Sequence, residues 1–546
     1  MTAAPTEYSA DAIGELDLTS DALVETQHLQ KNFGRREILL FTICTLVGVD
    51  TIGLLASLGA EAFTWNIVLA ITFFIPSALL FAELGTAFPQ EGGPYIWARL
   101  AFGRMAATIN NVLYWVTNPV WFGGTLSIVA VATVSVFFLG GNEMNTFWFY
   151  VFTMAFVWIG TLAAILSFRV GKYIPIAGAY ARFILLGFFT LSTIIFAFKN
   201  GVHGVGLSDF GATKAGLFAL AGVIMFGYVG FELPSAAGDE MKDPKKDVPF
   251  SIFRSAIVAI LMYSIPVLCV IIVLPADQVS GLGGFIDAMR SVFTVYGGSV
   301  DADGVATLTG LGSLLGAASA ILFILCLLSS GVAWIMGSDR ALAVSGYDGA
   351  APRYLGVISA KYGTPVRVNV LSGILGSAVV IAVHELSGGD SAKYFLVILS
   401  IAVSTTLISY IAIFPALWRL RVTHPDHPRP YRAPWAPFLS VLLTAWVIFA
   451  TVQLLLPGFG DDWFGDAYLP DGWVADERVK YFLVEAIPLL IFILVGVAFY
   501  FSGSRTRHHR ASEVGVAAVE DTAAEEIEAE EIAAEAEARA HEAEGS

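Results

Sequence analysis

Charged residues are scarce in this 546-residue chain. Only 14% of its residues are Asp, Glu, Lys or Arg, whereas a soluble chain carries about 25%. Apolar residues make up 56% of the sequence, and the mean hydropathy is +0.72. This balance excludes an ordinary soluble protein and predicts a polytopic membrane protein.

Cysteine is scarce as well, with only Cys44, Cys269 and Cys326. All three fall within apolar runs, where a free thiol serves as a small buried hydrophobic group. They form no disulfide framework and no metal-ligand spacing, so neither a metal nor another cofactor is predicted. The first 30 residues are polar and acidic, and no cleavable signal peptide is expected.

The motifs of the common enzyme classes are also missing. The chain has no Walker phosphate-binding loop, no H-E-x-x-H pattern and no nucleophile motif. An enzyme, an ATP-driven pump and a nucleic-acid partner are therefore not expected. A channel is less favoured than a carrier, because selectivity filters need rings of ligands, commonly from symmetric subunits. A nutrient sensor that binds its ligand without moving it stays open.

The net charge of −16 belongs mostly to the C-terminal end. Residues 511–546 hold twelve acidic residues and one arginine, so the other 510 residues carry a net charge of only −5. This Ala- and Glu-rich stretch has helix propensity but almost no apolar face. Residues 503–546 are interpreted as an acidic cytoplasmic tail, disordered or transiently helical, and residues 1–36 as a polar cytoplasmic segment.

Twelve segments are long and apolar enough to cross a bilayer, which takes about 20 residues per helix. Their approximate limits are 38–60, 65–88, 107–138, 147–168, 174–198, 216–240, 250–275, 307–338, 366–386, 393–420, 433–457 and 479–502. The predicted fold class is an all-α polytopic membrane protein with twelve transmembrane helices.

The basic residues predict the orientation of these helices. An even number of spans places both termini on one side of the membrane. With both termini in the cytoplasm, the outer loops hold only six of the 30 basic residues: Lys199, Lys214, Arg290, Lys393, Arg478 and Lys480. Because cytoplasmic loops are rich in Lys and Arg, both termini are expected on the cytoplasmic side of the plasma membrane.

A weak internal repeat relates the first span to the sixth. At an offset of 179 residues, four identical pairs align: Gly48 with Gly227, Leu54 with Leu233, Gly59 with Gly238, and Glu61 with Glu240. The repeats would comprise residues 37–200 and 214–422, with five spans each, and residues 433–502 would add two peripheral helices. Because five is odd, the halves would be inverted, as in many secondary transporters with a site at the repeat interface.

Each half contains an acidic residue in a glycine-interrupted span. Asp50 lies between Gly48 and Gly53 in TLVGVDTIGLLA, and Glu232 follows two glycines in FGYVGFELPSAAGDE. A charge at mid-bilayer costs at least about 2.5–3.5 kcal/mol, although glycines also serve close helix packing and a lone acid can be a protonated structural group. Two such stretches at matching positions favour broken helices that present backbone groups to a ligand.

The stretch GYVGFELPSAAGDEMKDPKKDVPFSI resembles the sixth-span signature of the amino acid–polyamine–organocation permeases. ELGTAFPQEGGPYIWARLAFG (83–103) and YDGAAPRYLGVISAKYGTPVRV (347–368) resemble that family's second-span exit and its loop after span 8. The resemblance covers roughly residues 35–505. It implies the leucine-transporter fold, which has a five-plus-five inverted repeat, discontinuous helices 1 and 6, and alternating access.

The resemblance also implies a substrate site between the two breaks. The substrate-binding residues would be Gly48, Val49, Asp50, Thr51, Ile52, Gly53, Phe226, Gly227, Tyr228, Val229, Gly230, Phe231, Glu232 and Trp334. The amides of residues 51–53 would receive a carboxylate, and Tyr228 and Phe231 would close the pocket. The expected substrates are amino acids or related amines, moved by proton-coupled symport or exchange, with transport of polyamines or cationic amines as the alternative.

Two residues depart from the family pattern. Many members have a Gly-Ser-Gly-like first break, whereas Asp50 would repel a substrate carboxylate. Asp50 is therefore protonated, or it binds the amine end, or the substrate is cationic. Arg182 resembles a lysine that proton-coupled relatives carry near the position of sodium in sodium-coupled ones. Because arginine stays protonated, Arg182 would be a fixed charge in the coupling mechanism, and Asp50 and Glu232 would carry the proton. The alternative is that the Arg182 side chain extends to the membrane interface.

Overall fold

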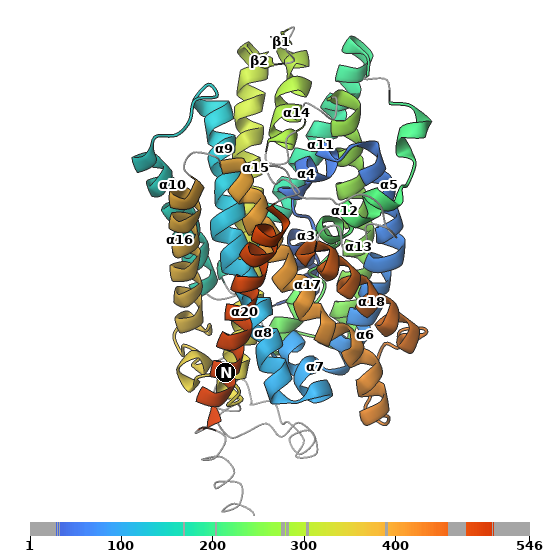
Figure 1. The fold of residues 1–546 in the computed structure, drawn as a ribbon, viewed down its shortest axis with the longest axis vertical. Helices are drawn as coiled ribbons and strands as arrows, with labels where there is room; N and C mark the ends of the chain where they lie inside the picture. Colours follow the sequence, from blue (N-terminus) through green and yellow to red (C-terminus); the bar gives the residue numbers. More distant parts are fainter. Residues whose placement is uncertain are drawn as a thin grey trace, which may run out of the picture.

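A computed structural model of the chain describes residues 29, 31, 33–166, 170–202, 205–274, 279, 283–301, 305–387, 391–456, 477–504 and 506. Most of the predicted N-terminal segment and nearly all of the acidic tail lie outside these residues. The described chain is almost entirely helical, and most of its long helices run roughly along the long axis of the molecule (Figure 1).

The α-helices of the first half are α3 (Arg35–Leu46), α4 (Thr51–Ser57), α5 (Gly59–Leu69), α6 (Ile75–Ala87), α7 (Gly93–Phe102), α8 (Arg104–Trp121), α9 (Ser127–Phe138), α10 (Thr146–Ile165) and α11 (Tyr173–Asn200). Those that follow are α12 (Lys214–Gly227), α13 (Pro244–Val273), α14 (Gly284–Phe293), α15 (Gly310–Tyr347), α16 (Val366–Ser387), α17 (Ser391–Thr423), α18 (Ala436–Leu455) and α20 (Arg478–Ser502).

Shorter elements connect or interrupt these helices. Two π-helical segments, η1 (Ala70–Phe74) and η2 (Phe122–Leu126), join α5 to α6 and α8 to α9. The 3-10 segments are η4 (Leu207–Phe210), η5 (Leu233–Glu240), η7 (Thr294–Tyr296) and η8 (Arg353–Gly356). Strands β1 (Gly298–Val300) and β2 (Ala306–Leu308) form an antiparallel hairpin just before α15.

Ten helices within the described ranges are long and apolar enough to cross a membrane. Together α3 and α4, which are bent by 41° at their break, would make an eleventh. The predicted span 216–240 does not pass as one helix, because α12 has only 14 residues. The protein is therefore an all-helical membrane protein with ten to eleven candidate spans, and the twelfth span stays a prediction.

The first two spans differ from their predicted limits. Gly59 has a φ of +79°, a conformation that glycine adopts without steric cost, and the chain turns there between α4 and α5. The second span then runs over Gly59–Ala87, with the π-helical segment η1 inside it. It begins six residues before the predicted start. The helix α14 and the hairpin, which precede α15, had no counterpart in the predicted spans.

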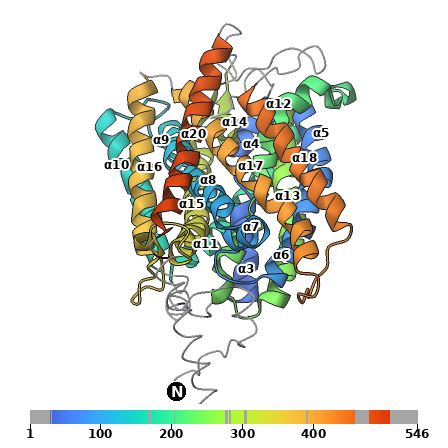
Figure 2. The ribbon, with the colours of Figure 1, turned by 60° about the horizontal axis from the view of Figure 1, so that its bottom comes forward.

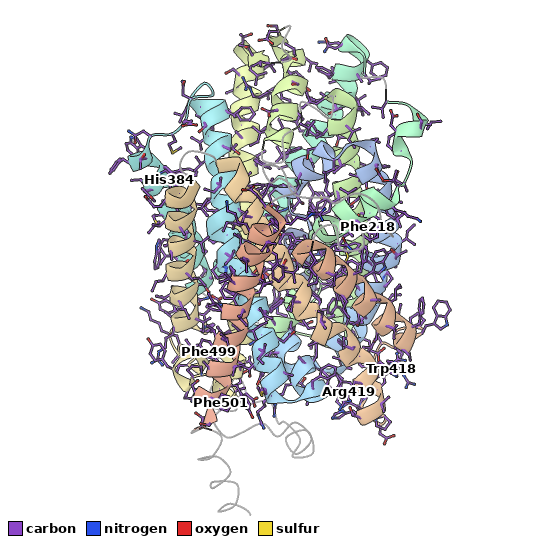
Figure 3. All side chains as sticks on the ribbon, in the orientation of Figure 1. Phe218, His384, Trp418, Arg419, Phe499 and Phe501 are labelled. Atoms are coloured by element: carbon purple, nitrogen blue, oxygen red, sulfur yellow. The ribbon has the colours of Figure 1, made fainter. Side chains whose placement is uncertain are left out.

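Helix α8 lies at the centre of the bundle, where it packs against α15, α16, α17 and α20. Helices α18 and α20 lie at the outside (Figure 2). Trp418 and Phe501, labelled in Figure 3, are 45% and 61% exposed. Apolar side chains on the outside of the bundle are those expected to contact lipid.

The three cysteines are free and buried, as their apolar surroundings predicted.

Ion pairs with buried carboxylates join elements of the bundle. Arg340 of α15 lies 2.8 Å from Glu240 and 3.4 Å from Glu91. Glu83 of α6 is bound by Arg421 and by Arg429. Burial raises the pKa of Glu91 well above its ordinary value; Glu240 adds to this rise and Arg340 opposes it. Removing one partner of a buried pair is strongly destabilising, so these contacts join α15 firmly to η5 and α6 to α17.

Candidate functional site

The first helix break separates α3 from α4, which end and begin at Leu46 and Thr51. Side chains from other helices bind the backbone groups that the break exposes. The carbonyl of Val47 accepts a hydrogen bond from Arg182 Nε (2.8 Å), and the N–H of Gly48 donates to the Tyr263 hydroxyl (2.8 Å). Within a membrane such groups need partners inside the protein or on a ligand.

The second break follows α12, which ends at Gly227, and precedes η5. Gly230 within it has a φ of +125°, which residues with a Cβ rarely adopt. The Gly230 carbonyl accepts a hydrogen bond from Thr45 Oγ1 (3.3 Å), and the Thr45 carbonyl accepts one from Trp334 Nε1 (3.1 Å). Helices α3 and α12 end 181 residues apart, close to the offset of 179 in the sequence repeat.

A cavity lies between the two breaks. In this conformation the cavity measures about 20 Å³, which is room for a water molecule, so an organic substrate would require its walls to move apart. Its walls are Thr45, Leu46, Gly48, Asp50, Thr51, Thr117, Asn118, Trp121, Phe226, Gly227, Tyr263 and Trp334. Asp50 is the one charged residue among them.

The Asp50 carboxylate is only partly satisfied. Its Oδ2 accepts a hydrogen bond from Trp121 Nε1 (3.0 Å), whereas its buried Oδ1 has no hydrogen-bond partner among the described residues. Only 6% of Asp50 is exposed. A buried carboxylate oxygen without a partner is costly, so this atom is the clearest candidate for a contact with a cationic ligand.

Aromatic rings form much of the remaining wall. The Trp121 ring meets Phe226 edge to face, with ring centroids 5.8 Å apart, and meets Trp334 in the same way at 6.3 Å. The Tyr263 hydroxyl lies within 3.3 Å of Thr51 Oγ1. The site therefore combines one carboxylate with an aromatic enclosure, which is a suitable environment for an organic cation.

The predicted substrate-binding residues divide into two groups. Six of the fourteen line the cavity: Gly48, Asp50, Thr51, Phe226, Gly227 and Trp334. The other eight are not among its walls: Val49, Ile52, Gly53, Tyr228, Val229, Gly230, Phe231 and Glu232.

Glu232 lies beside the cavity, among tyrosines. Its Oε1 accepts a hydrogen bond from the Tyr114 hydroxyl (2.9 Å), and Tyr410 is a further neighbour. The rings of Tyr228 and Phe231 both stack on Phe74, with centroids 4.6 Å apart in each case. These side chains of the second break thus pack against η1, α8 and α17 in this conformation.

Arg182 is fully buried and joins three elements of the bundle. Besides Val47, its guanidinium donates to Ser329 Oγ (2.9 Å), to the Cys326 carbonyl (2.8 Å) and to Ser330 Oγ. The side chain is enclosed by protein on all sides. It connects the end of α3 with α11 and α15, directly behind the first break.

Several cavity residues were not predicted from the sequence. Thr117, Asn118 and Trp121 come from α8, Thr45 and Leu46 from α3, and Tyr263 from α13. Asn118 precedes Pro119 within an apolar span, and a polar residue beside a proline is a signal that could have pointed to α8. Tyr263 has no comparable signal, because a single tyrosine in a span is common.

Gly53 does not line the cavity; it packs closely against the backbone of α14. A Cβ at this position would lie 2.8 Å from the backbone nitrogen of Phe285 in α14. We expect Gly53→Ala to lower the stability by about 1–3 kcal/mol, because overpacking forces backbone shifts. Gly187→Ala is the matched control, since a Cβ there meets no atom within 4 Å. Thermal melting in detergent should show a lower midpoint for Gly53→Ala alone; equal midpoints would contradict this packing.

Comparisons with known proteins agree with these features. The sequence profile of a family described as "Amino acid permease" matches residues 33–463. An uncharacterized transporter of Legionella pneumophila is 28% identical, over 85% of this chain and 96% of that protein. A probable agmatine/putrescine antiporter of Lactococcus lactis is 26% identical, over 74% and 82% of the two chains. A branched-chain amino acid permease of Bacillus subtilis is 22% identical, over 89% and 95%.

Proposed function

Because the chain belongs to the amino acid permease family, we propose that it is a secondary active transporter that moves amino acids or related organic amines by alternating access. Membership in the family confirms the resemblance drawn from the three sequence motifs. The members of this family are transporters rather than enzymes, which agrees with the absence of catalytic motifs from the sequence.

One observation carries the proposal. The two helix breaks enclose a cavity in which the buried Oδ1 of Asp50 has no partner among the described residues. Intramembrane carboxylates are expensive and mark substrate or ion pathways. A site between two discontinuous helices is the usual arrangement in secondary transporters built from inverted repeats. The ammonium group of a substrate would supply the missing partner of Asp50.

The proposed fold is the leucine-transporter fold with twelve spans. Helix α12 and η5 would together form the sixth span, as α3 and α4 form the first. Residues 37–200 and 214–422 would be the two inverted repeats, and residues 433–502 the peripheral helices. Both termini would face the cytoplasm across the plasma membrane.

The site residues would have different roles in substrate binding and in proton coupling. Asp50 would bind the amine, and Asp50 or Glu232 would carry a coupling proton. Arg182 would act as a fixed positive charge that holds the first break against α15. Tyr228 and Phe231 would close the pocket in a different conformation from the one described, since both now stack on Phe74.

Counterflow in proteoliposomes tests the proposal. Vesicles are preloaded with amino acids, monoamines and polyamines, and labelled glutamate, arginine, leucine, phenethylamine or putrescine is added outside, with and without a pH gradient. A carrier shows saturable uptake that the internal pool accelerates. Flux without saturation would indicate a channel, and binding without flux would indicate a sensor; either result would contradict the proposal.

Exchange of polyamines is the second candidate function. It is favoured by Asp50, because a fixed anion in the first break suits a cationic substrate, and by the similarity to a probable agmatine/putrescine antiporter. Putrescine counterflow in the same vesicles would identify this activity.

A further inference from the structure

Helix α20 carries a buried acidic residue that lies outside the substrate cavity. The helix itself lies at the outside of the bundle (Figure 2), and its buried residues are Tyr481, Glu485, Leu489 and Gly496. Because they are four or seven residues apart, they share the face that packs against α8 and α17. Glu485 is 0% exposed, and it lies about 10 Å along the axis from the first residue of the helix.

The carboxyl group of Glu485 is not satisfied by hydrogen bonds. Both of its oxygens are buried without a partner among the described residues. Ser400 of α17 is a polar neighbour, and its Oγ lies 3.1 Å from the Tyr481 hydroxyl. A leucine would fill this position without any polar group to bury, whereas a carboxyl group without hydrogen bonds is costly there. Acidic residues within membrane spans are rare and mark substrate, ion or proton pathways.

The helices around Glu485 supply no counter-charge among their described side chains. Helix α18 contains no charged residue, and Arg104, the one charged residue of α8, pairs with a buried aspartate. The charged residues of α17 with described side chains are Arg419 and Arg421, at the other end of that helix. The titratable group nearby is the Tyr481 hydroxyl. These surroundings therefore suit the neutral acid, which holds one proton.

A row of hydroxyl groups on α17 begins at Ser400 and leads away from Glu485. Over about 15 Å of this helix, six buried residues carry a hydroxyl group and form what we call the hydroxyl row: Ser400, Ser404, Thr405, Thr406, Ser409 and Tyr410. Ser404 Oγ and the Tyr410 hydroxyl have no hydrogen-bond partner in the described part of the chain. The row therefore has hydrogen-bonding capacity that the fold does not use.

The hydroxyl row reaches the site between the two helix breaks. Thr405 Oγ1 lies 2.8 Å from Thr117 Oγ1, and Thr117 lines the cavity. At the end of the row, Tyr410 is a neighbour of Glu232 in the second break. Two buried glutamates thus lie at opposite ends of one row, Glu485 beside Ser400 and Glu232 beside Tyr410.

We propose that Glu485 is a proton-binding site outside the substrate cavity, and that the hydroxyl row conducts protons between Glu485 and Glu232. The inference rests on the proposed transport function, because it assigns a site to a coupling proton. Glu485 binds the proton as a carboxylic acid and releases it as a carboxylate, without electron transfer. Each hydroxyl donates one hydrogen bond and accepts others, so neighbouring hydroxyls would pass the proton directly or through a bridging water.

Infrared titration of the full-length protein in liposomes tests the proton site without a substrate. Carboxylic-acid bands are recorded against pH in the unmodified protein, in Glu485→Gln and in Glu477→Gln. Glu477 is the matched control, because it directly precedes α20 and pairs with Lys480 at 3.4 Å. We expect a pH-dependent band of a buried acid that is absent from Glu485→Gln alone. Identical spectra of the unmodified protein and Glu485→Gln at every pH would overturn the inference.

Transport driven by a pH gradient tests the coupling role. The five labelled compounds of the counterflow assay are offered to vesicles at equal pH and with a pH gradient. We expect Glu485→Gln to lower gradient-driven accumulation at least 10-fold and counterflow at equal pH less than 3-fold, because exchange needs no net release of the proton. Glu485→Asp keeps the acid and should restore at least a third of the accumulation.

Three results would overturn the coupling role of Glu485. The first is accumulation by Glu485→Gln at the level of the unmodified protein. The second is an equal loss in Glu485→Gln and Glu485→Asp, which would indicate a packing role. The third is transport by the unmodified protein that does not respond to the gradient. If no compound is exchanged or accumulated at all, the proposed transport function fails, whereas the infrared titration still decides whether Glu485 binds a proton.

Ser404→Ala tests the hydroxyl row. The substitution removes a hydroxyl from the middle of the row and should slow gradient-driven uptake at least 3-fold. Ser440→Ala on α18 is the matched control, because Ser440 Oγ is also buried without a partner among the described residues but lies outside the row. Equal uptake rates in the two variants would overturn conduction along the row.

Discussion

Asp50→Asn is expected to reduce the affinity for a transported amine by at least about 30-fold and to remove measurable counterflow at low substrate concentration. The substitution keeps the size of the side chain but removes the one negative charge among the cavity walls. Removing one partner of a buried charge pair costs about 2–5 kcal/mol, which corresponds to roughly 30-fold or more in the dissociation constant. Competition binding and counterflow over a range of substrate concentrations measure the effect.

Asp287→Asn is the matched control for Asp50→Asn. Asp287 lies on α14, is partly exposed and is not a wall residue of the cavity. The control should bind and transport as the unmodified protein does. Unchanged amine affinity in Asp50→Asn, with normal melting behaviour, would show that Asp50 does not bind the substrate.

Arg182→Ala is expected to have the largest effect on stability. It leaves two carbonyls and two hydroxyls without their guanidinium donor. Each buried acceptor that loses its partner costs about 1–3 kcal/mol, so the loss should reach at least about 3 kcal/mol. The melting midpoint in detergent should fall by roughly 3 °C or more, and transport should be lost because the first break is no longer held against α15.

Arg182→Lys tests whether the positive charge of this side chain is sufficient without the geometry of the guanidinium group. An ammonium keeps the positive charge but cannot reproduce the planar fork of donors, so an intermediate melting midpoint and partial transport are expected. Arg254→Ala is the control, because Arg254 is exposed and stacks on Phe250. If Arg182→Ala melted and transported like this control, Arg182 would have no supporting role.

Local signals in the sequence were sufficient to locate both helix breaks. Glycines beside an acidic residue in an apolar span are unusual enough to indicate that the helix opens. Helix α12 ends at Gly227, and α3 ends two residues before Gly48. The walls of the cavity were harder to predict. Trp121 and Tyr263 come from α8 and α13, and only the packing of these helices against the breaks places them at the site.

The direction of each side chain in a break could not be predicted either. In a regular helix the period of 3.6 residues indicates which side chains share a face, but that period is lost where the backbone opens. Glu232 is directed to Tyr114, whereas Asp50 is directed into the cavity. The two acids occupy similar positions in the sequence pattern and nevertheless have different surroundings.

Burial of all three native cysteines makes the protein a convenient background for site-specific labelling. A water-soluble maleimide should react far faster with one introduced, exposed cysteine than with Cys44, Cys269 or Cys326, so none of them needs to be replaced. Asp287→Cys on α14 would be an informative position. The backbone of α14 contacts Gly53 of α4, and a fluorophore there would report when a ligand shifts the first broken helix.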